Sequence, residues 1–123
     1  LKAVINSGGL ADLEASEPVT LESCLSDIAQ DLTGAPGESR QNVYSDTSVA
    51  ELLPVTAQLI SVNGDRDQIA PPSLGSALTE KVLLSGSNGR FIKVAETGHV
   101  ELIAPGSSAF ELQAQLIETI LAE

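Results

Sequence analysis

The chain has 123 residues, 42% of them hydrophobic, which is enough for one small domain with a buried core. Its formal net charge of −11 argues against nucleic acid and anionic membrane surfaces as partners, because both attract clustered Lys and Arg. No apolar run approaches the ~20 residues that span a bilayer. The single cysteine excludes an internal disulfide and a multi-cysteine metal site. Cys24 lies in an apolar helical pattern, so we predict a buried, inert thiol.

The N-terminal half of the sequence predicts one strand and two helices. Residues 2–6 form a short apolar run that indicates a strand, and a pair of glycines follows it. Apolar residues then recur at helical spacing over residues 20–32, which predicts an amphipathic helix with Thr20 as its N-cap. Residues 33–42 carry Gly and Pro without periodic apolar positions, so we expect a loop. A capping-box pattern that begins at Ser48 predicts a further short helix.

The C-terminal half alternates strands and helices. Residues 55–63 are apolar through their end, which is typical of a parallel strand buried on both faces. Two prolines at 71 and 72 suit the first turn of a helix that runs to about residue 84. Residues 91–96 predict the next strand. Ser107 and Ser108 open the last helix, and Ser108 begins a second capping box.

This order of elements predicts an α/β fold, with a parallel sheet, right-handed crossovers and helices on both faces. We expect residues 1–123 to form a single partial domain. Three strands would leave an apolar sheet edge open, which requires further strands or a covering partner chain.

One acid and the only histidine of the chain follow two neighbouring strands. Asp67 comes just after the first of them and His99 just after the second. Sites in open parallel sheets form beyond the carboxyl ends of the strands, so we expect the two side chains to meet there. A carboxylate that holds one imidazole nitrogen leaves the other free to take a proton from a hydroxyl. Gly64 would permit the tight turn before Asp67, and Gly98 a close approach of the histidine loop.

Other interpretations of these residues are open to test. His99 could be a surface histidine or a satisfied core histidine. Asp65 is a rival acid, for which a solvated capping role fits better. Asn63, Asp65 and Asp67 alternate as calcium-loop ligands do, but Gln68 stands where such a loop needs glycine. We therefore predict no metal site and no cofactor.

Two segments carry a resemblance to a known family. Residues 63–72, NGDRDQIAPP, and residues 98–105, GHVELIAP, resemble the last third of α/β-hydrolases, most closely the esterase and prolyl-oligopeptidase-like branch. In that branch a G-x-x-D-x-I-V-P segment carries the acid of the catalytic triad, and a G-H-F-E-L-I-D-P segment carries its base. The resemblance implies that Asp67 is the acid and His99 the base. The departures, at Ala70, Val100 and Ala104, remove no group that the mechanism needs.

The resemblance extends loosely over nearly the whole chain. Residues 3–13 are similar to the sixth strand of that fold and its following loop, and residues 47–54 to the short helix before the acid-bearing strand. It implies strands six to eight of the α/β-hydrolase fold. Residues 14–46 stand where the family places its cap, and their one predicted helix implies only a small lid.

The family's nucleophile is missing from this pattern. It is a serine on a G-x-S-x-G elbow, and no such motif occurs in the sequence. Ser7 is the nearest candidate, but Ile5 stands where the first glycine should be. The chain begins at Leu1 and has no methionine, so we expect a fragment whose nucleophile-bearing N-terminal part is absent.

The resemblance therefore implies the C-terminal fragment of a serine hydrolase, inactive alone, that acts on carboxylic esters or small peptides. Its partners would be that substrate and the N-terminal part of the same hydrolase, or another covering chain. The alternative is a non-catalytic interaction module derived from a hydrolase fold.

Overall fold

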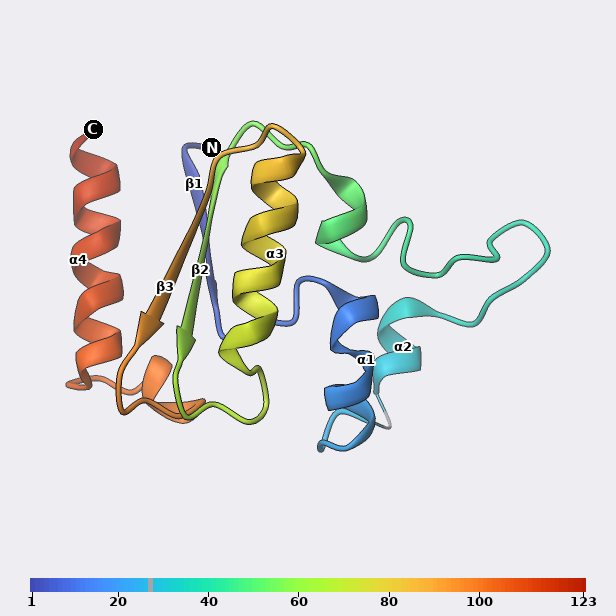
Figure 1. Ribbon diagram of the computed structural model, residues 1–123, viewed down its shortest axis with the longest axis horizontal. Coiled ribbons are helices and arrows are strands. Elements are labelled where there is room, and N and C mark those ends of the chain that lie inside the picture. The colour runs from blue at the N-terminus through green and yellow to red at the C-terminus, as the bar shows by residue number, and fades with distance from the viewer. Residues whose placement is uncertain (27) are drawn as a thin grey trace.

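A computed structural model describes residues 1–26 and 28–123, and its sheet stands between two helices (Figure 1). The strands pair in parallel in the order β1-β2-β3 and are β1 (Ala3–Ser7), β2 (Gln58–Gly64) and β3 (Gly89–Val94). The helices in chain order are α1 (Leu13–Leu21), α2 (Ala29–Thr33), α3 (Pro72–Leu84) and α4 (Ser108–Ala122), with the 3-10 helices η1 (Val49–Leu52) and η2 (Val100–Leu102). α3 covers one face of the sheet and α4 the other, which confirms the predicted α/β fold. Among the described residues, no helix combines the length and the apolar character that crossing a membrane requires.

The central strand β2 is buried on both faces, as its apolar sequence predicts. Ile60 and Val62 lie on the face toward α4, and Ser61 and Asn63 on the face toward α3. All four are at most 2% exposed. The strand therefore provides a rigid base for the loop that follows Gly64.

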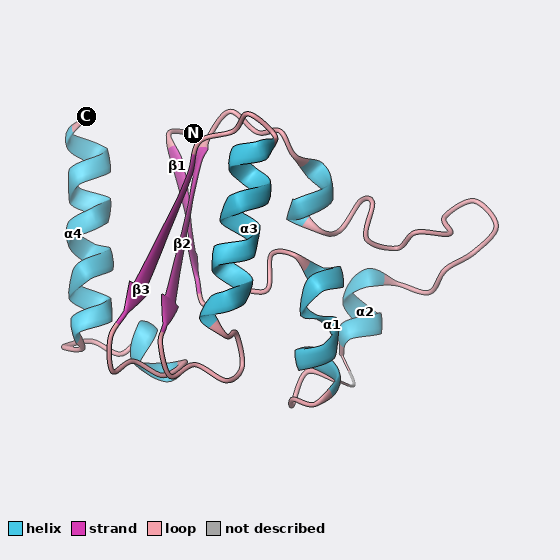
Figure 2. Cartoon of the chain, in the orientation of Figure 1, coloured by secondary structure: helices cyan, strands magenta, loops and turns pink. Residues whose placement is uncertain are grey.

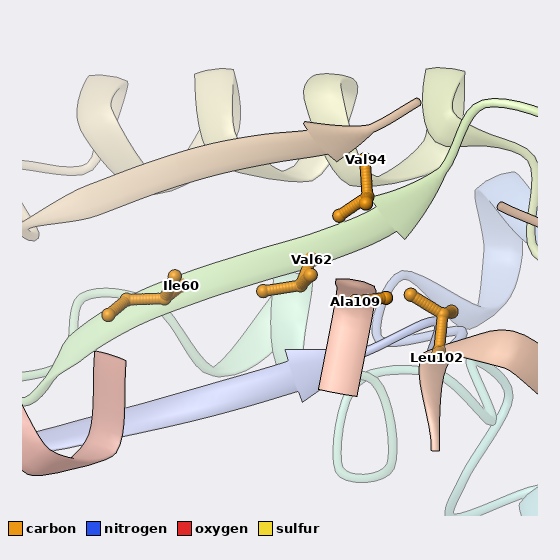
Figure 3. Packing of buried hydrophobic residues seen from close by; sticks show 5 residues of the cluster. All are labelled: Ile60, Val62, Val94, Leu102 and Ala109. Atoms are coloured by element: carbon orange, nitrogen blue, oxygen red, sulfur yellow. The ribbon is translucent and has the colours of Figure 1, made fainter. Parts of the chain in front are cut away.

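The hydrophobic core lies between the sheet and α4. Five buried side chains form its centre, namely Ile60, Val62, Val94, Leu102 and Ala109 (Figure 3). They come from β2, β3, η2 and the first turn of α4, so the core fixes η2 against the strand ends. Since η2 follows His99 directly, the core also fixes the position of the histidine loop.

The apolar residues of α4 are divided between the core and solvent. Leu116 and Ile120 pack against the core, as does Leu112. Phe110 and Ile117, by contrast, are 38% and 47% exposed. The packed stripe begins at Ala109, whose small side chain is fully buried in the core, and continues through Leu112, Leu116 and Ile120.

The ends of β2 and β3 lie at the same edge of the sheet. Gly64, the last residue of β2, pairs with Val94, the last residue of β3. Figure 2 shows the arrowheads of both strands pointing to one edge, where the loops to α3 and η2 leave side by side. The loops that carry Asp67 and His99 therefore begin together, as predicted from parallel strands.

The predicted helix over residues 20–32 is wrong. α1 begins earlier, where Asp12 accepts a hydrogen bond from the Ala15 amide and acts as N-cap. The chain turns after α1, and the Ser23 hydroxyl accepts from the Leu25 amide there. A Ser side chain that bonds the local backbone competes with helix in this way.

Three further local predictions differ from the structure. Cys24 lies in this turn and is exposed rather than buried. Ser48 precedes η1 but forms no capping box, because its hydroxyl accepts from the Leu13 amide at 3.1 Å and so ties α1 to η1. At α4 the capping residue is Ser107, one position before the predicted Ser108, and its hydroxyl accepts from the amide of Phe110, the third residue of the helix.

Candidate active site

Asp67 is a buried acid held by its own loop. Its Oδ1 accepts hydrogen bonds from the amides of Ile69 and Ala70, both at 2.9 Å. Its Oδ2 lies 2.7 Å from Nδ1 of His99. The side chain is fully buried. Both oxygens are thus occupied, and the carboxylate can orient the imidazole but is closed to solvent.

His99 stands at the start of η2 and is half open to solvent. Its side chain is 40% exposed. With Nδ1 donating to Asp67, Nε2 is left as the acceptor that can take a proton. Within residues 1–26 and 28–123, Asp67 is the only side chain that hydrogen-bonds the His99 ring. The two predicted site residues are therefore brought together in the geometry of an acid–base pair, which we call the dyad.

A set of contacts that we call the Asp65–Thr97 clamp joins the two loops of the dyad. Oδ1 of Asp65 accepts from the Thr97 amide at 3.1 Å. The Arg66 amide donates to the Thr97 carbonyl at 3.0 Å, and the Asp65 amide to Val94 at 3.0 Å. Thr97 is two residues before His99, so the clamp sets the position of the base relative to the acid.

The clamp identifies the role of Asp65. Hydrogen bonds from the amides of Thr97 and then Glu96 lower the pKa of Asp65, and the residue is exposed. The same bonds stabilise Glu96 in a left-handed conformation, with φ of +52°. Asp65 therefore caps the histidine loop, while the contact with His99 belongs to Asp67.

Close approach of the loops depends on Gly64. A Cβ there would lie 2.2 Å from the Thr97 carbonyl oxygen. At Gly98, where close approach was also predicted, a Cβ would meet only the flexible carboxylate of Glu101. The backbone contact therefore occurs at the end of β2.

The residues after β1 also contact the dyad, which sequence reasoning missed. Gly8 has φ of +59°, and its amide donates to the Val62 carbonyl at 2.8 Å. A Cβ at Gly8 would lie 3.4 Å from both Asp67 Oδ2 and His99 Cε1. The glycine pair after a short strand is a signal that could have predicted this contact. Ser7, just before it, has a buried hydroxyl without a hydrogen-bond partner and does not engage His99.

The three residues that alternate like calcium ligands have separate partners. Asn63 donates to the Ala70 carbonyl, Asp65 binds Thr97 and Asp67 binds His99. Over the described ranges, no group of three or more His, Cys, Asp and Glu side chains could hold a metal ion.

A pocket of about 730 Å³ opens beside His99. It is lined by His99 and Ile69, by residues of α1 and α2, by residues 8–10, and by Gly34, Pro36, Val43 and Tyr44. Its volume lies within the range of about 300–1,000 Å³ that is common for small-molecule sites. The exposed side of the dyad therefore faces a cavity large enough for a substrate.

Comparisons with known proteins agree with this arrangement at the level of the fold. No known family matches the sequence, and no curated protein is similar to it. Among solved structures, acetyl xylan esterase 1 from Thermoanaerobacterium sp. is similar over 98% of this chain and 38% of its own, with a TM-score of 0.61 and 18% identity. A thermophilic esterase from Thermogutta terrifontis is similar over 95% of this chain and 39% of its own, with a TM-score of 0.60 and 12% identity. A monoacylglycerol lipase from Paleococcus ferrophilus is similar over 99% of this chain and 59% of its own, with a TM-score of 0.56 and 15% identity.

These similarities establish the fold. The chain spans less than two thirds of each of these structures. The prediction of the C-terminal portion of an α/β-hydrolase fold is confirmed.

Proposed function

We propose that this chain is the C-terminal part of a serine hydrolase that cleaves carboxylic esters, and that it supplies Asp67 and His99 to a Ser–Asp–His triad. The observation that carries the proposal is the 2.7 Å contact between a fully buried carboxylate and a half-exposed imidazole beside a pocket. Esterases and a lipase among the similar structures support this class of reaction. Small peptides are the second substrate class that the same chemistry would serve.

In this mechanism each residue has a defined step. Nε2 of His99 takes the proton of the serine hydroxyl as its oxygen attacks the ester carbonyl, and then gives that proton to the leaving alcohol. Asp67 stabilises the imidazolium that forms in between. Water then repeats the sequence and releases the acid. Because both oxygens of Asp67 are already bound, its charge is held in place before the reaction begins.

The serine would come from a segment outside these 123 residues. In the described part of the chain β1 pairs with one neighbour only, so one of its edges is free to accept a further strand. The similar structures are longer than this chain, which supports the same interpretation. Another covering chain at that edge is the alternative arrangement.

The experiment compares the 123-residue chain with the full-length polypeptide that contains it in its source. Each is treated with a fluorophosphonate probe and with p-nitrophenyl acetate. We expect labelling and turnover of the full-length polypeptide only. In that polypeptide, Asp67→Asn should lower kcat by about 10⁴-fold, because the imidazole loses its orienting charge. Asp46→Asn is the matched control, since Asp46 pairs with Arg40 on the exposed loop.

The second candidate is a non-catalytic interaction module derived from the same fold. It is favoured by the buried Ser7 hydroxyl, which forms no hydrogen bond with His99. If the full-length polypeptide is not labelled by the fluorophosphonate, and His99→Ala does not change its turnover of p-nitrophenyl acetate, the module is favoured and the hydrolase refuted. Labelling of the 123-residue chain alone would instead refute the assignment of the serine to another segment.

A further inference from the structure

We infer that the pocket beside His99 selects an uncharged or cationic apolar group of the substrate and rejects carboxylates. The inference names the substrate class of the proposed hydrolase and rests on that proposed function. It is carried by the chemistry of the pocket lining.

The lining is largely aliphatic. Leu13 and Leu21 from α1, and Leu25 and Ile28 from the segment after it, face the pocket with Ile69 from the acid loop. Leu21 and Ile28 are 61% and 53% exposed, although both are large and apolar. An unbranched alkyl or aryl group of an ester would cover these side chains and remove their apolar surface from water.

The ionised carboxylate of the described lining is that of Glu17, and the nearby cation Arg40, beside Gly34, is paired with Asp46. Among the described residues that line it, the titratable side chains are Glu17, Tyr44 and His99, and none is Lys or Arg. Burial, followed by the charges of Glu17 and Glu14, raises the pKa of Tyr44, so the phenol stays neutral near pH 7. The chain as a whole carries a net charge of −11. A carboxylate that entered the pocket would lose water and find no Lys or Arg among the described lining residues to replace it.

This charge distribution has a consequence for turnover. The ester that enters is neutral, whereas the acid released by hydrolysis is ionised near neutral pH. The pocket therefore binds the ester and repels its carboxylate product. The same group is accepted before the reaction and expelled after it, which limits inhibition by product.

Binding to the 123-residue chain tests the inference without any need for a nucleophile. Methyl hexanoate, hexylammonium and hexanoate share a similar apolar chain and differ in charge. Displacement of the neutral dye Nile red gives their affinities, and amide shifts of Ile69 and His99 in NMR spectra locate the binding. Glu17→Gln is compared with Glu22→Gln. Both remove one charge from an exposed glutamate near α1, but only Glu17 lines the pocket.

We expect methyl hexanoate to bind, and hexylammonium to bind about tenfold more tightly than hexanoate. Glu17→Gln should reduce this ratio by about threefold, the range of an exposed charge pair, and Glu22→Gln should leave it unchanged. Equal affinity for hexanoate and hexylammonium, equal effects of the two variants, or no binding of methyl hexanoate would overturn the inference. Selective binding combined with a full-length polypeptide that resists fluorophosphonate would refute the hydrolase and leave the binding site intact.

Discussion

The contact between Gly64 and Thr97 offers the sharpest test of how the fold positions the dyad. Gly64→Ala places a Cβ 2.2 Å from the Thr97 carbonyl oxygen and 2.8 Å from its carbon. Real Cβ contacts are at least 3.0 Å, and the obstacle is backbone, which cannot rotate away. The histidine loop must therefore move away from the end of β2.

The size of the effect follows from two opposing terms. Overpacking a buried contact costs about 1–3 kcal/mol, and the hydrogen bond from the Arg66 amide to Thr97, worth about 1 kcal/mol, is stretched as well. Replacing glycine by alanine also lowers the conformational entropy of the unfolded chain, which stabilises the folded state by about 0.4–1 kcal/mol. We expect a net loss of about 2 kcal/mol in the free energy of unfolding, or roughly 8 °C in Tm for a domain of this size.

Gly37→Ala is the matched control. An alanine Cβ at position 37 would have no heavy atom within 4 Å, and neither Gly37 nor Gly64 has a positive φ. Only the unfolded-state term applies to it, so its stability should stay equal or rise by up to about 1 kcal/mol.

Urea unfolding followed by circular dichroism measures both variants, and proton NMR follows the Nδ1–H that His99 donates to Asp67. Gly64→Ala should broaden or shift this proton, because the displaced loop lengthens the 2.7 Å contact. If Gly64→Ala is as stable as Gly37→Ala and keeps the imidazole signal unchanged, the clamp does not position the base.

Three further substitutions address single interactions. Asp65→Asn should make the loss of stability between pH 7 and about pH 3 smaller. A carboxylate whose pKa is lowered in the folded state stabilises the fold at a pH above its unfolded-state pKa of about 3.9, and this contribution is lost as the pH falls through the folded-state pKa. The exposed Asp31→Asn is the control in the same urea titrations. Leu102→Ala should cost about 2–5 kcal/mol and Leu84→Ala less than about 0.5, since the two are 1% and 88% exposed, and similar losses would contradict the assigned core. Ser107→Ala should cost about 1 kcal/mol in thermal unfolding by removing the N-cap of α4, and an unchanged Tm would refute that cap.

The dyad could be predicted because its determinants are local. Asp67 and His99 each lie a few residues beyond a strand, and parallel pairing of neighbouring strands brings such positions to one edge without further information. The central strand β2 was predicted for the same reason, since a largely apolar run of residues indicates burial on both faces. What sequence could not supply was the clamp, because its donor on the histidine loop is the backbone amide of Thr97, which no side-chain pattern marks.

The segment after β1 shows where a periodic pattern misleads. Leu21, Leu25 and Ile28 recur at helical spacing, which predicted the face of a long helix. In the structure they line the pocket beside His99 instead of packing in a core. The signal that mattered was Asp12, which caps α1 and binds Lys81 on α3 at 2.5 Å. That distant ion pair fixes α1 in a way that no local pattern reveals.

The dyad and its supports form a compact unit in the chain. The acid, the base, the clamp and the core residue Leu102 all lie between Gly64 and the end of η2, and Gly8 approaches the dyad from outside this stretch. In the proposed hydrolase, substitutions in the pocket lining on α1 and α2 would therefore leave the geometry of this acid–base unit unchanged. The same property makes it a candidate for transplantation, in which strands β2 and β3 with their loops would be grafted into another parallel sheet.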